Sequence, residues 1–108
     1  QLAIEYCNSL VDSPQLRTQF FPGFDFALPA AQAFDTPVER DLIVVPLFAR
    51  AVGSGLATQP SAAELRTELD GLMGKLAACG AGCPADRTST VVKASCAAVI
   101  GAAGTLLQ

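Results

Sequence analysis

The chain contains no histidine, the side chain that most often transfers protons or binds metals near neutral pH. This absence excludes a serine–histidine–aspartate triad, a cysteine–histidine pair and the Cys-x-x-Cys-His signature of haem attachment. The close acidic pairs, Glu39 with Asp41 and Glu64 with Glu68, fit helix starts or solvated faces. We therefore expect a protein that is not an enzyme and that holds no cofactor or metal.

Positive charge is also scarce. Seven Lys and Arg residues stand singly along the chain against ten Asp and Glu residues, which gives a net charge of −3. A nucleic-acid-binding protein needs clustered cations that displace counterions from phosphates. Gly53-Ser54-Gly55 lacks the lysine of a phosphate-binding loop and is more typical of a helix stop. The sequence therefore predicts no nucleic-acid partner.

Aromatic residues are few and tryptophan is absent, although 51% of the residues are hydrophobic. A composition dominated by Ala, Leu and Val is typical of closely packed helices rather than of a β-sandwich. The 108 residues fit one domain, 1–108, with a core of its own. The uncharged stretch from Ala94 to Leu107 is shorter than the roughly 20 residues that a bilayer span requires. Membrane insertion is therefore disfavoured.

Apolar residues recur at helical spacing along most of the chain, which predicts an all-α bundle of four to five helices. The first helix covers residues 1–12, and Ser13-Pro14 provides an N-cap and a first helical residue for a second, short helix. The sequences at 36–39 and 61–64 have the form of capping boxes and should begin two longer helices. A last helix should cover most of the chain after Thr88, with Asp86 or Thr88 as its cap.

Three features inside these helices carry further expectations. Pro46 cannot donate to the carbonyl four residues back, so it should kink or divide the helix that contains it. Gly71 and Gly74 each destabilise a helix by about 1 kcal/mol relative to alanine, which predicts that another helix approaches closely there. Arg66 and Asp70 stand one turn apart and should pair on the solvated face.

Four cysteines allow three disulfide pairings. Cys7 and Cys96 lie in the apolar stripes of the first and last helices, so we expect them to pair across the core. Cys79 and Cys83 are then left to close a tight loop at the intervening glycines. Disulfides form in the periplasm or outside the cell, which predicts an extracytoplasmic location.

Other cysteine chemistry is less favoured. A zinc site needs a second closely spaced pair, which Cys7 and Cys96 do not form. The spacing of Cys79 and Cys83 is one residue longer than that of a thioredoxin-type dithiol, and no strand pattern accompanies it. A thiol–disulfide enzyme therefore stays as a minor alternative, and it would require an exposed, easily reduced pair.

Contact residues are harder to assign. Four of the six phenylalanines lie within residues 20–26, around a Pro-Gly turn. The favoured interpretation is that they plug one end of the bundle, and the alternative is a ligand or partner patch that includes Phe24 and Phe26. Small residues in the last helix would let another helix approach, which adds Leu106 and Leu107 as candidate contacts.

Five phrases spread over nearly the whole chain carry a family resemblance: QLAIEYC (1–7), FFPGF (20–24), DLIVVPLFAR (41–50), LATQP (56–60) and VVKASC (91–96). Together they resemble a helical region of large exported bacterial proteins that contain laminin-G-like (LamG) domains. The resemblance implies an extracytoplasmic module of a longer polypeptide. Some of those proteins carry c-type haem segments elsewhere, but this chain lacks the haem signature, so that role transfers to no residue here.

The sequence thus predicts a non-catalytic structural or protein-interaction module at the cell surface or outside the cell. Its partners would be neighbouring domains of the same polypeptide or further copies of itself. The alternative is a carrier that encloses a lipid or another small apolar ligand among disulfide-tied helices. A sizeable apolar cavity would favour the carrier, and a close-packed core would oppose it.

Overall fold

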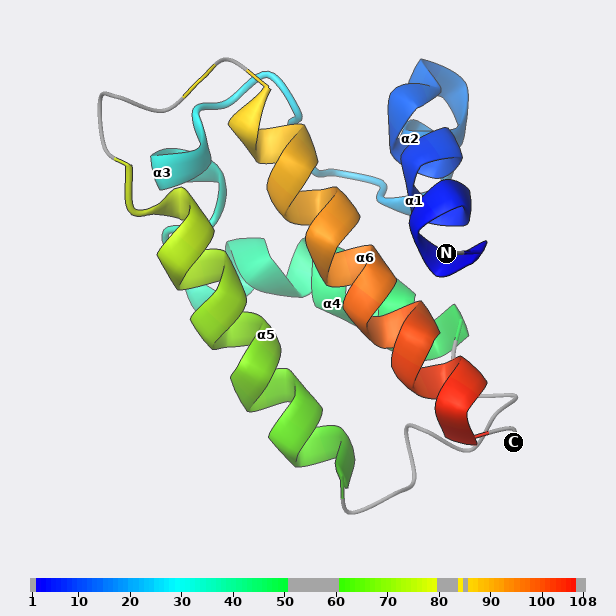
Figure 1. Ribbon diagram of the computed structural model, residues 1–108. Helices are drawn as coiled ribbons and strands as arrows, with labels where there is room; N and C mark the ends of the chain where they lie inside the picture. Colours follow the sequence, from blue (N-terminus) through cyan, green and yellow to red (C-terminus); the bar gives the residue numbers. More distant parts are fainter. Residues whose placement is uncertain (1, 51–60, 80–83, 85, 107–108) are drawn as a thin grey trace.

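The computed structural model describes residues 2–50, 61–79, 84 and 86–106, and these residues form six α-helices and no strand (Figure 1). The predicted all-α class is confirmed. The helices are α1 (Leu2–Asp12), α2 (Pro14–Phe20), α3 (Ala30–Ala33), α4 (Pro37–Arg50), α5 (Ser61–Ala77) and α6 (Arg87–Leu106).

The helix beyond the predicted four to five is α3, a single turn of four residues. Pro29 precedes it with φ −58°, and its carbonyl accepts hydrogen bonds from the amides of Gln32 and Ala33, both at 2.9 Å. Ala30 and Ala33 are buried in the core. A proline-initiated turn of small apolar residues is stable here because the turn packs, although it is too short to be recognised by periodicity.

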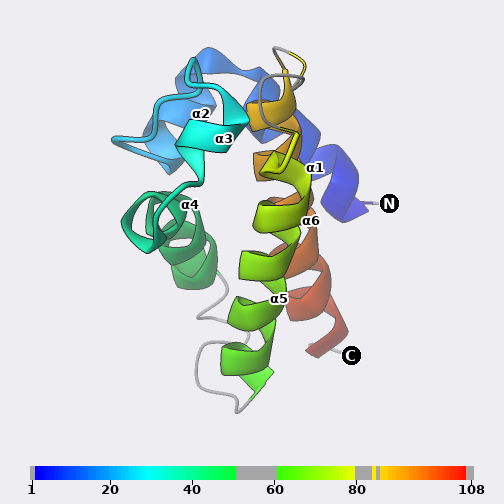
Figure 2. The ribbon, with the colours of Figure 1, turned by 90° about the vertical axis from the view of Figure 1, so that its left-hand side faces the viewer.

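α6 is the central element of the bundle. α5 runs antiparallel to α6 on one side, α1 runs antiparallel to it on the other, and α4 crosses behind both α5 and α6 (Figure 1). Seen from the side, α2 lies above α4 on the same side of the molecule (Figure 2). α6 therefore contacts α1, α3, α4 and α5.

The core is formed by apolar side chains from every helix except α2, joined by Phe21 and Phe34 from the intervening segments. The apolar faces predicted for the first and last helices both contribute side chains to this core. The buried apolar residues are Cys7, Leu10, Val11, Phe21, Ala30, Ala33, Phe34, Ile43, Val44, Leu47, Leu69, Met73, Ala77, Val91, Val92, Cys96 and Val99.

The predicted helix starts are largely confirmed. The Ser13 hydroxyl accepts a hydrogen bond from the Leu16 amide at 3.3 Å, as an N-cap should. Before α4, the Thr36 hydroxyl accepts from the Glu39 amide at 3.3 Å and donates to the Glu39 carboxylate at 3.0 Å. The carboxylate thus bonds the hydroxyl of the capping residue instead of its backbone amide, which is half of the expected capping box.

The start of α6 settles the choice between Asp86 and Thr88. The helix begins at Arg87, directly after Asp86, whose carbonyl accepts from the Thr90 amide at 3.0 Å. Thr88 is buried inside the first turn, and its hydroxyl donates to the Leu28 carbonyl at 2.6 Å. Thr88 therefore ties α6 to the segment before α3 and does not cap the helix.

The structure narrows one expectation about helix interiors and contradicts another. α4 continues through Pro46 as one helix and is not divided, because Ile43, Val44 and Leu47 anchor it in the core on both sides of the missing donor. The predicted close approach at Gly71 and Gly74 is wrong, since a Cβ atom added at either position would meet no atom within 4 Å. These glycines accommodate no neighbouring helix.

Candidate functional site

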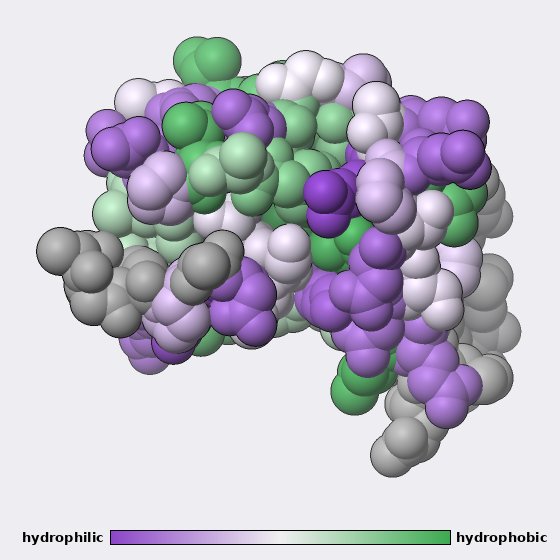
Figure 3. All heavy atoms as spheres, turned by 90° about the horizontal axis from the view of Figure 1, so that it is seen from above, coloured by the Kyte–Doolittle hydropathy of each residue, from purple (hydrophilic) through white to green (hydrophobic). Residues whose placement is uncertain are grey.

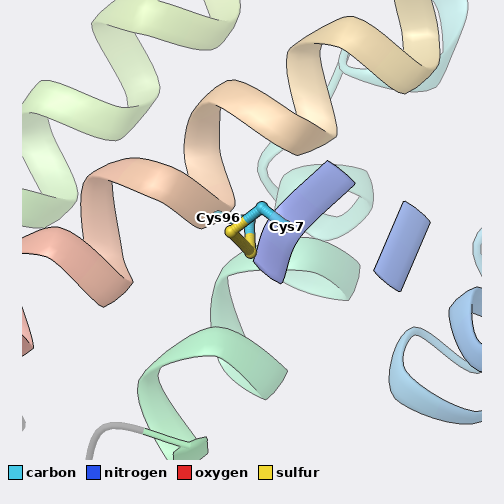
Figure 4. Close-up of a disulfide and its surroundings, with 2 residues drawn as sticks. All are labelled: Cys7 and Cys96. Carbon is cyan, nitrogen blue, oxygen red and sulfur yellow. A yellow bond between two sulfur atoms is a disulfide. The ribbon is translucent and has the colours of Figure 1, made fainter. Parts of the chain in front are cut away.

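The predicted bridge between the first and last helices is present. Cys7 on α1 and Cys96 on α6 form a disulfide with their Cα atoms 5.8 Å apart (Figure 4). Both residues are completely buried. The Lys93 ammonium lies 2.7 Å from an Asp12 carboxylate oxygen and adds a second link between the same two helices. The bond has no solvent-exposed atom for a reductant to attack, so its chemistry is that of a structural crosslink.

The other predicted cysteine pair is only half described. Cys79 lies two residues after the end of α5 and is half-buried, with its sulfur 3.8 Å from the Leu76 carbonyl oxygen. Cys83 lies outside the described residues, as do Leu107 and the side chain of Leu106. The short bridge and the terminal leucine contacts therefore stay predictions.

The phenylalanine segment folds around a type II turn, in which the Phe24 amide donates to the Phe21 carbonyl at 3.3 Å and Gly23 has φ +86°. Phe24 and Phe26 pack edge to face with ring centroids 4.8 Å apart. Phe24 also contacts buried Phe34 at 5.5 Å. Both rings are half-buried against the core, which is the arrangement of a plug at one end of the bundle.

This end of the molecule keeps some apolar surface. Viewed from above, hydrophobic residues occupy the middle of the face and hydrophilic residues border it (Figure 3). The Arg17 guanidinium covers the Phe26 ring at 4.8 Å, and its Nη1 donates to the Val11 carbonyl at 3.4 Å. Arg17 thereby fastens the aromatic segment to the end of α1, and Phe26 is shielded on that side.

A network of charges joins α4 to α5. The predicted pair is present, with Arg66 Nε 3.5 Å from Asp70 Oδ2. Arg66 also bonds Asp41 on α4 through Nη2, and Arg40 Nη1 lies 3.8 Å from Asp70 Oδ1. Burial alone would lower the pKa of Arg66, but the hydrogen bond to Asp41 and the charges of Asp41 and Asp70 outweigh it and raise that pKa. The two cross-helix contacts were not predicted, because residues far apart in sequence give no periodic signal.

Three adjoining depressions run over the surface of α1, α2 and α4. The first and second share Gln19 and Phe20 as lining residues, and the second and third share Pro46. We call the three depressions together the apolar groove. The first depression, of about 390 Å³, is lined by Tyr6, Ser9, Leu10, Leu16, Gln19 and Phe20. The second, of about 490 Å³, is lined by Gln19, Phe20, Pro46 and Ala49. The third, of about 370 Å³, is lined by Pro22, Val38, Asp41, Leu42, Val45 and Pro46.

Large apolar side chains of the groove remain in contact with solvent. Val38 is 74% exposed, Val45 57%, Leu16 44% and Tyr6 42%. Among the described residues that line the groove, Asp41 is the one that carries a charge, and its carboxylate is engaged by Arg66. The described part of this lining can bury an apolar surface of another molecule and contains no acid–base pair.

Sequence reasoning missed this groove although α4 carries a signal for it. Ile43, Val44 and Leu47 supply the stripe that faces the core. Val38, Leu42 and Val45 form a second stripe at spacings of four and three residues, which lies on the groove side. A surface helix needs only one apolar face, which packs on the core, so a second apolar face on α4 indicates a surface that another molecule could cover.

In the part of the chain that the structure describes, no three His, Cys, Asp or Glu residues are placed so that they could hold a metal ion. None of the described helices combines the length and the apolar character of a membrane span.

Comparison of the chain with protein-family models, with curated proteins and with solved structures found no match. The resemblance to the helical region of LamG-containing proteins therefore stays a prediction.

Proposed function

We propose that this chain is a non-catalytic structural or protein-interaction module that works outside the cytoplasm, as part of a cell-surface or secreted protein. The observation that carries the proposal is the apolar groove, which presents exposed Leu16, Val38 and Val45 on a frame whose first and last helices are covalently joined. Contact of such apolar side chains with water is unfavourable, and covering them with a partner lowers the free energy.

The disulfide supports the proposed location. Cys7 and Cys96 are completely buried and joined, and a disulfide of this kind persists in oxidising compartments. The proposed setting is a longer exported polypeptide, in agreement with the resemblance to LamG-containing proteins.

Site-specific photo-crosslinking tests the proposed function. A photoreactive amino acid replaces Leu16, and the purified oxidised protein is irradiated with the extracytoplasmic fraction of its source cells. We expect a discrete protein adduct, either with a different protein or with a second copy. The same reagent at Glu68, an exposed position on α5, is the matched control. The proposal is wrong if position 16 gives no protein adduct, or gives the same adducts as position 68.

The rival function is a carrier for a small apolar molecule, and one observation favours it. The first depression has the volume of a small-ligand site, and Ser9 and Gln19 add uncharged hydrogen-bonding groups to its apolar lining. Native mass spectrometry of protein purified without detergent decides between the two functions. A stoichiometric lipid or other small molecule that Leu16→Ser removes would establish the carrier.

A further inference from the structure

The described residues that line the apolar groove are uncharged except for Asp41, and acidic residues lie at both of its ends. At the α1 end, Glu5 lies one turn before Ser9, which lines the first depression. At the α4 end, Glu39 lies next to Val38, which lines the third depression. Glu5 is exposed and Glu39 is half-buried, with its carboxylate accepting the Thr36 hydroxyl, and no described cation lies within ion-pair distance of either glutamate.

Three described cations on α4, α5 and α6 are paired with carboxylates, whereas Arg17 on α2 covers the Phe26 ring and donates to the Val11 carbonyl. Arg66 is held by Asp41 and Asp70, and Arg40 lies against Asp70 and donates through Nε to the Phe34 carbonyl at 3.0 Å. Lys93 pairs with Asp12. The carboxylates of Glu5 and Glu39 therefore have no described cation partner beside the groove, and the net charge of the chain is −3. Charge complementarity selects a positively charged occupant and disfavours a second copy, which would bring the same glutamates.

The walls of the groove also select the shape of the occupant. The described lining residues come from α1, α2 and α4 and, with Pro22, from the turn after α2, so they offer side chains and no free sheet edge. An extended peptide laid in it would leave backbone amides and carbonyls without partners, whereas a helix satisfies them internally. Helix-in-groove recognition places apolar residues at positions i, i+3 or i+4, and i+7 in such a surface.

We propose that the apolar groove binds a cationic amphipathic helix of another protein. The apolar face of that helix packs on Leu16, Phe20 and Val45, and its Lys and Arg side chains face Glu5 and Glu39. This inference rests on the proposed interaction function and names the chemistry of its partner.

The probe is a displayed library of 15-residue amphipathic peptides with a fixed apolar face and randomised charge on the other face. It is selected for binding to the oxidised wild-type protein. We expect the enriched peptides to carry net positive charge and to become helical on binding, as measured by circular dichroism. The inference is overturned if enrichment favours neutral or acidic peptides, or if the enriched peptides bind without helix formation.

Single substitutions then locate the binding. Leu16→Ser and Val45→Ser should each weaken the enriched peptides by about tenfold, because each removes an apolar contact of the size that hot-spot residues provide. Ile4→Ser is the matched control, since Ile4 is an exposed apolar residue of α1 that does not line the groove. Equal affinity of all three variants and the wild type would place the binding elsewhere and refute the inference.

The charge contribution has its own control. Glu5→Gln should weaken binding by about threefold at low salt, and this difference should vanish in 1 M salt. Glu68→Gln, at an exposed position on α5, should have no effect. Equal effects of the two substitutions would show attraction by net charge alone and overturn the proposed orientation.

The inference and the proposed function fail in different experiments. A protein adduct at position 16, combined with a library that yields no cationic helix, would leave the interaction function standing and reject this partner class. A dimer in solution that Leu16→Ser dissociates would show that a second copy occupies the groove, which also rejects it.

Discussion

The buried hydroxyl of Ser95 is unfavourable for the stability of the fold. Its side chain on α6 is completely buried, and its hydroxyl has no hydrogen-bond partner in the described structure. A buried hydroxyl without a partner lowers the free energy of unfolding by about 1–3 kcal/mol. By contrast, the buried hydroxyl of Thr88 donates to the Leu28 carbonyl.

We expect Ser95→Ala to raise the free energy of unfolding by about 1 kcal/mol, because alanine keeps the Cβ atom and removes the unpaired hydroxyl. Thr88→Val is the matched contrast and should lower it by about 1–3 kcal/mol, since the Leu28 carbonyl would lose its donor. Urea denaturation monitored by circular dichroism measures both. A destabilised Ser95→Ala variant would mean that the hydroxyl has a partner after all.

Gly71 and Gly74 give a second residue-scale prediction. Because both are helical and a Cβ atom would meet nothing, Gly71→Ala and Gly74→Ala should each raise the free energy of unfolding by about 1 kcal/mol. Gly23→Ala is the control and should be destabilising, since Gly23 has φ +86°. Thermal and urea denaturation provide the measurements. A loss of stability at Gly71 or Gly74 would restore the close helix approach that the structure contradicts.

At the scale of elements, the sequence predicts helices well where caps and periodicity agree. Ser13 and Thr36 mark their helix starts by hydrogen bonds that the residue types alone suggest. The single turn α3 is not predictable, because its stability comes from burying Ala30 and Ala33 against α5 and α6. Local sequence encodes caps and stripes, but it does not encode which exposed stripe finds a partner.

The contact between α4 and α5 yields a prediction at this scale. In a double-mutant cycle of Asp41→Asn and Arg66→Met, we expect a coupling energy of about 0.5–1 kcal/mol. The value is modest because the two side chains are 46% and 34% exposed, and it should shrink in 1 M salt. Coupling that is absent at low salt would show that the ion pair contributes nothing to holding α4 on α5.

The direction of the Arg66 pKa shift determines how the contact between α4 and α5 depends on pH. Because the pKa of Arg66 is raised in the folded state, its contribution is fully present below the unfolded-state pKa. The contribution is lost only as the pH rises through the higher folded-state value, at strongly alkaline pH. The coupling should therefore be unchanged between pH 7 and pH 10, which the same double-mutant cycle can check at both values.

For the whole molecule, the long disulfide is the main stabilising link. Cys7 and Cys96 are 89 residues apart, so their bond should stabilise the fold by about 4 kcal/mol in the chain-entropy account. We expect Cys7→Ala with Cys96→Ala to lower the free energy of unfolding by at least that amount. Cys79→Ala with Cys83→Ala should cost far less, because the predicted short bridge closes a small loop. Similar losses in the two double variants would contradict the assigned role of the long bridge.

The candidate site was less predictable than the fold. Cys7 and Cys96 could be paired from their apolar stripes, since a disulfide between buried faces follows from periodicity. The apolar groove could not be predicted, because it forms where α1, α2 and α4 meet and no local sequence pattern indicates how these helices are placed relative to one another. Only the second stripe of α4, with Val38 and Val45, signalled a surface without an internal partner.

The position of the long bridge has a mechanical consequence. When force is applied to the chain before Cys7 and after Cys96, the disulfide transmits it directly. The residues between the two cysteines therefore carry none of that force. In single-molecule stretching, the reduced protein should extend by about 300 Å more than the oxidised one, since the 89-residue separation is released. Equal extensions would show that the bond does not bear the force. With the bond intact, α2 to α5 keep their shape under tension, and a surface built on them stays assembled while the ends are pulled apart.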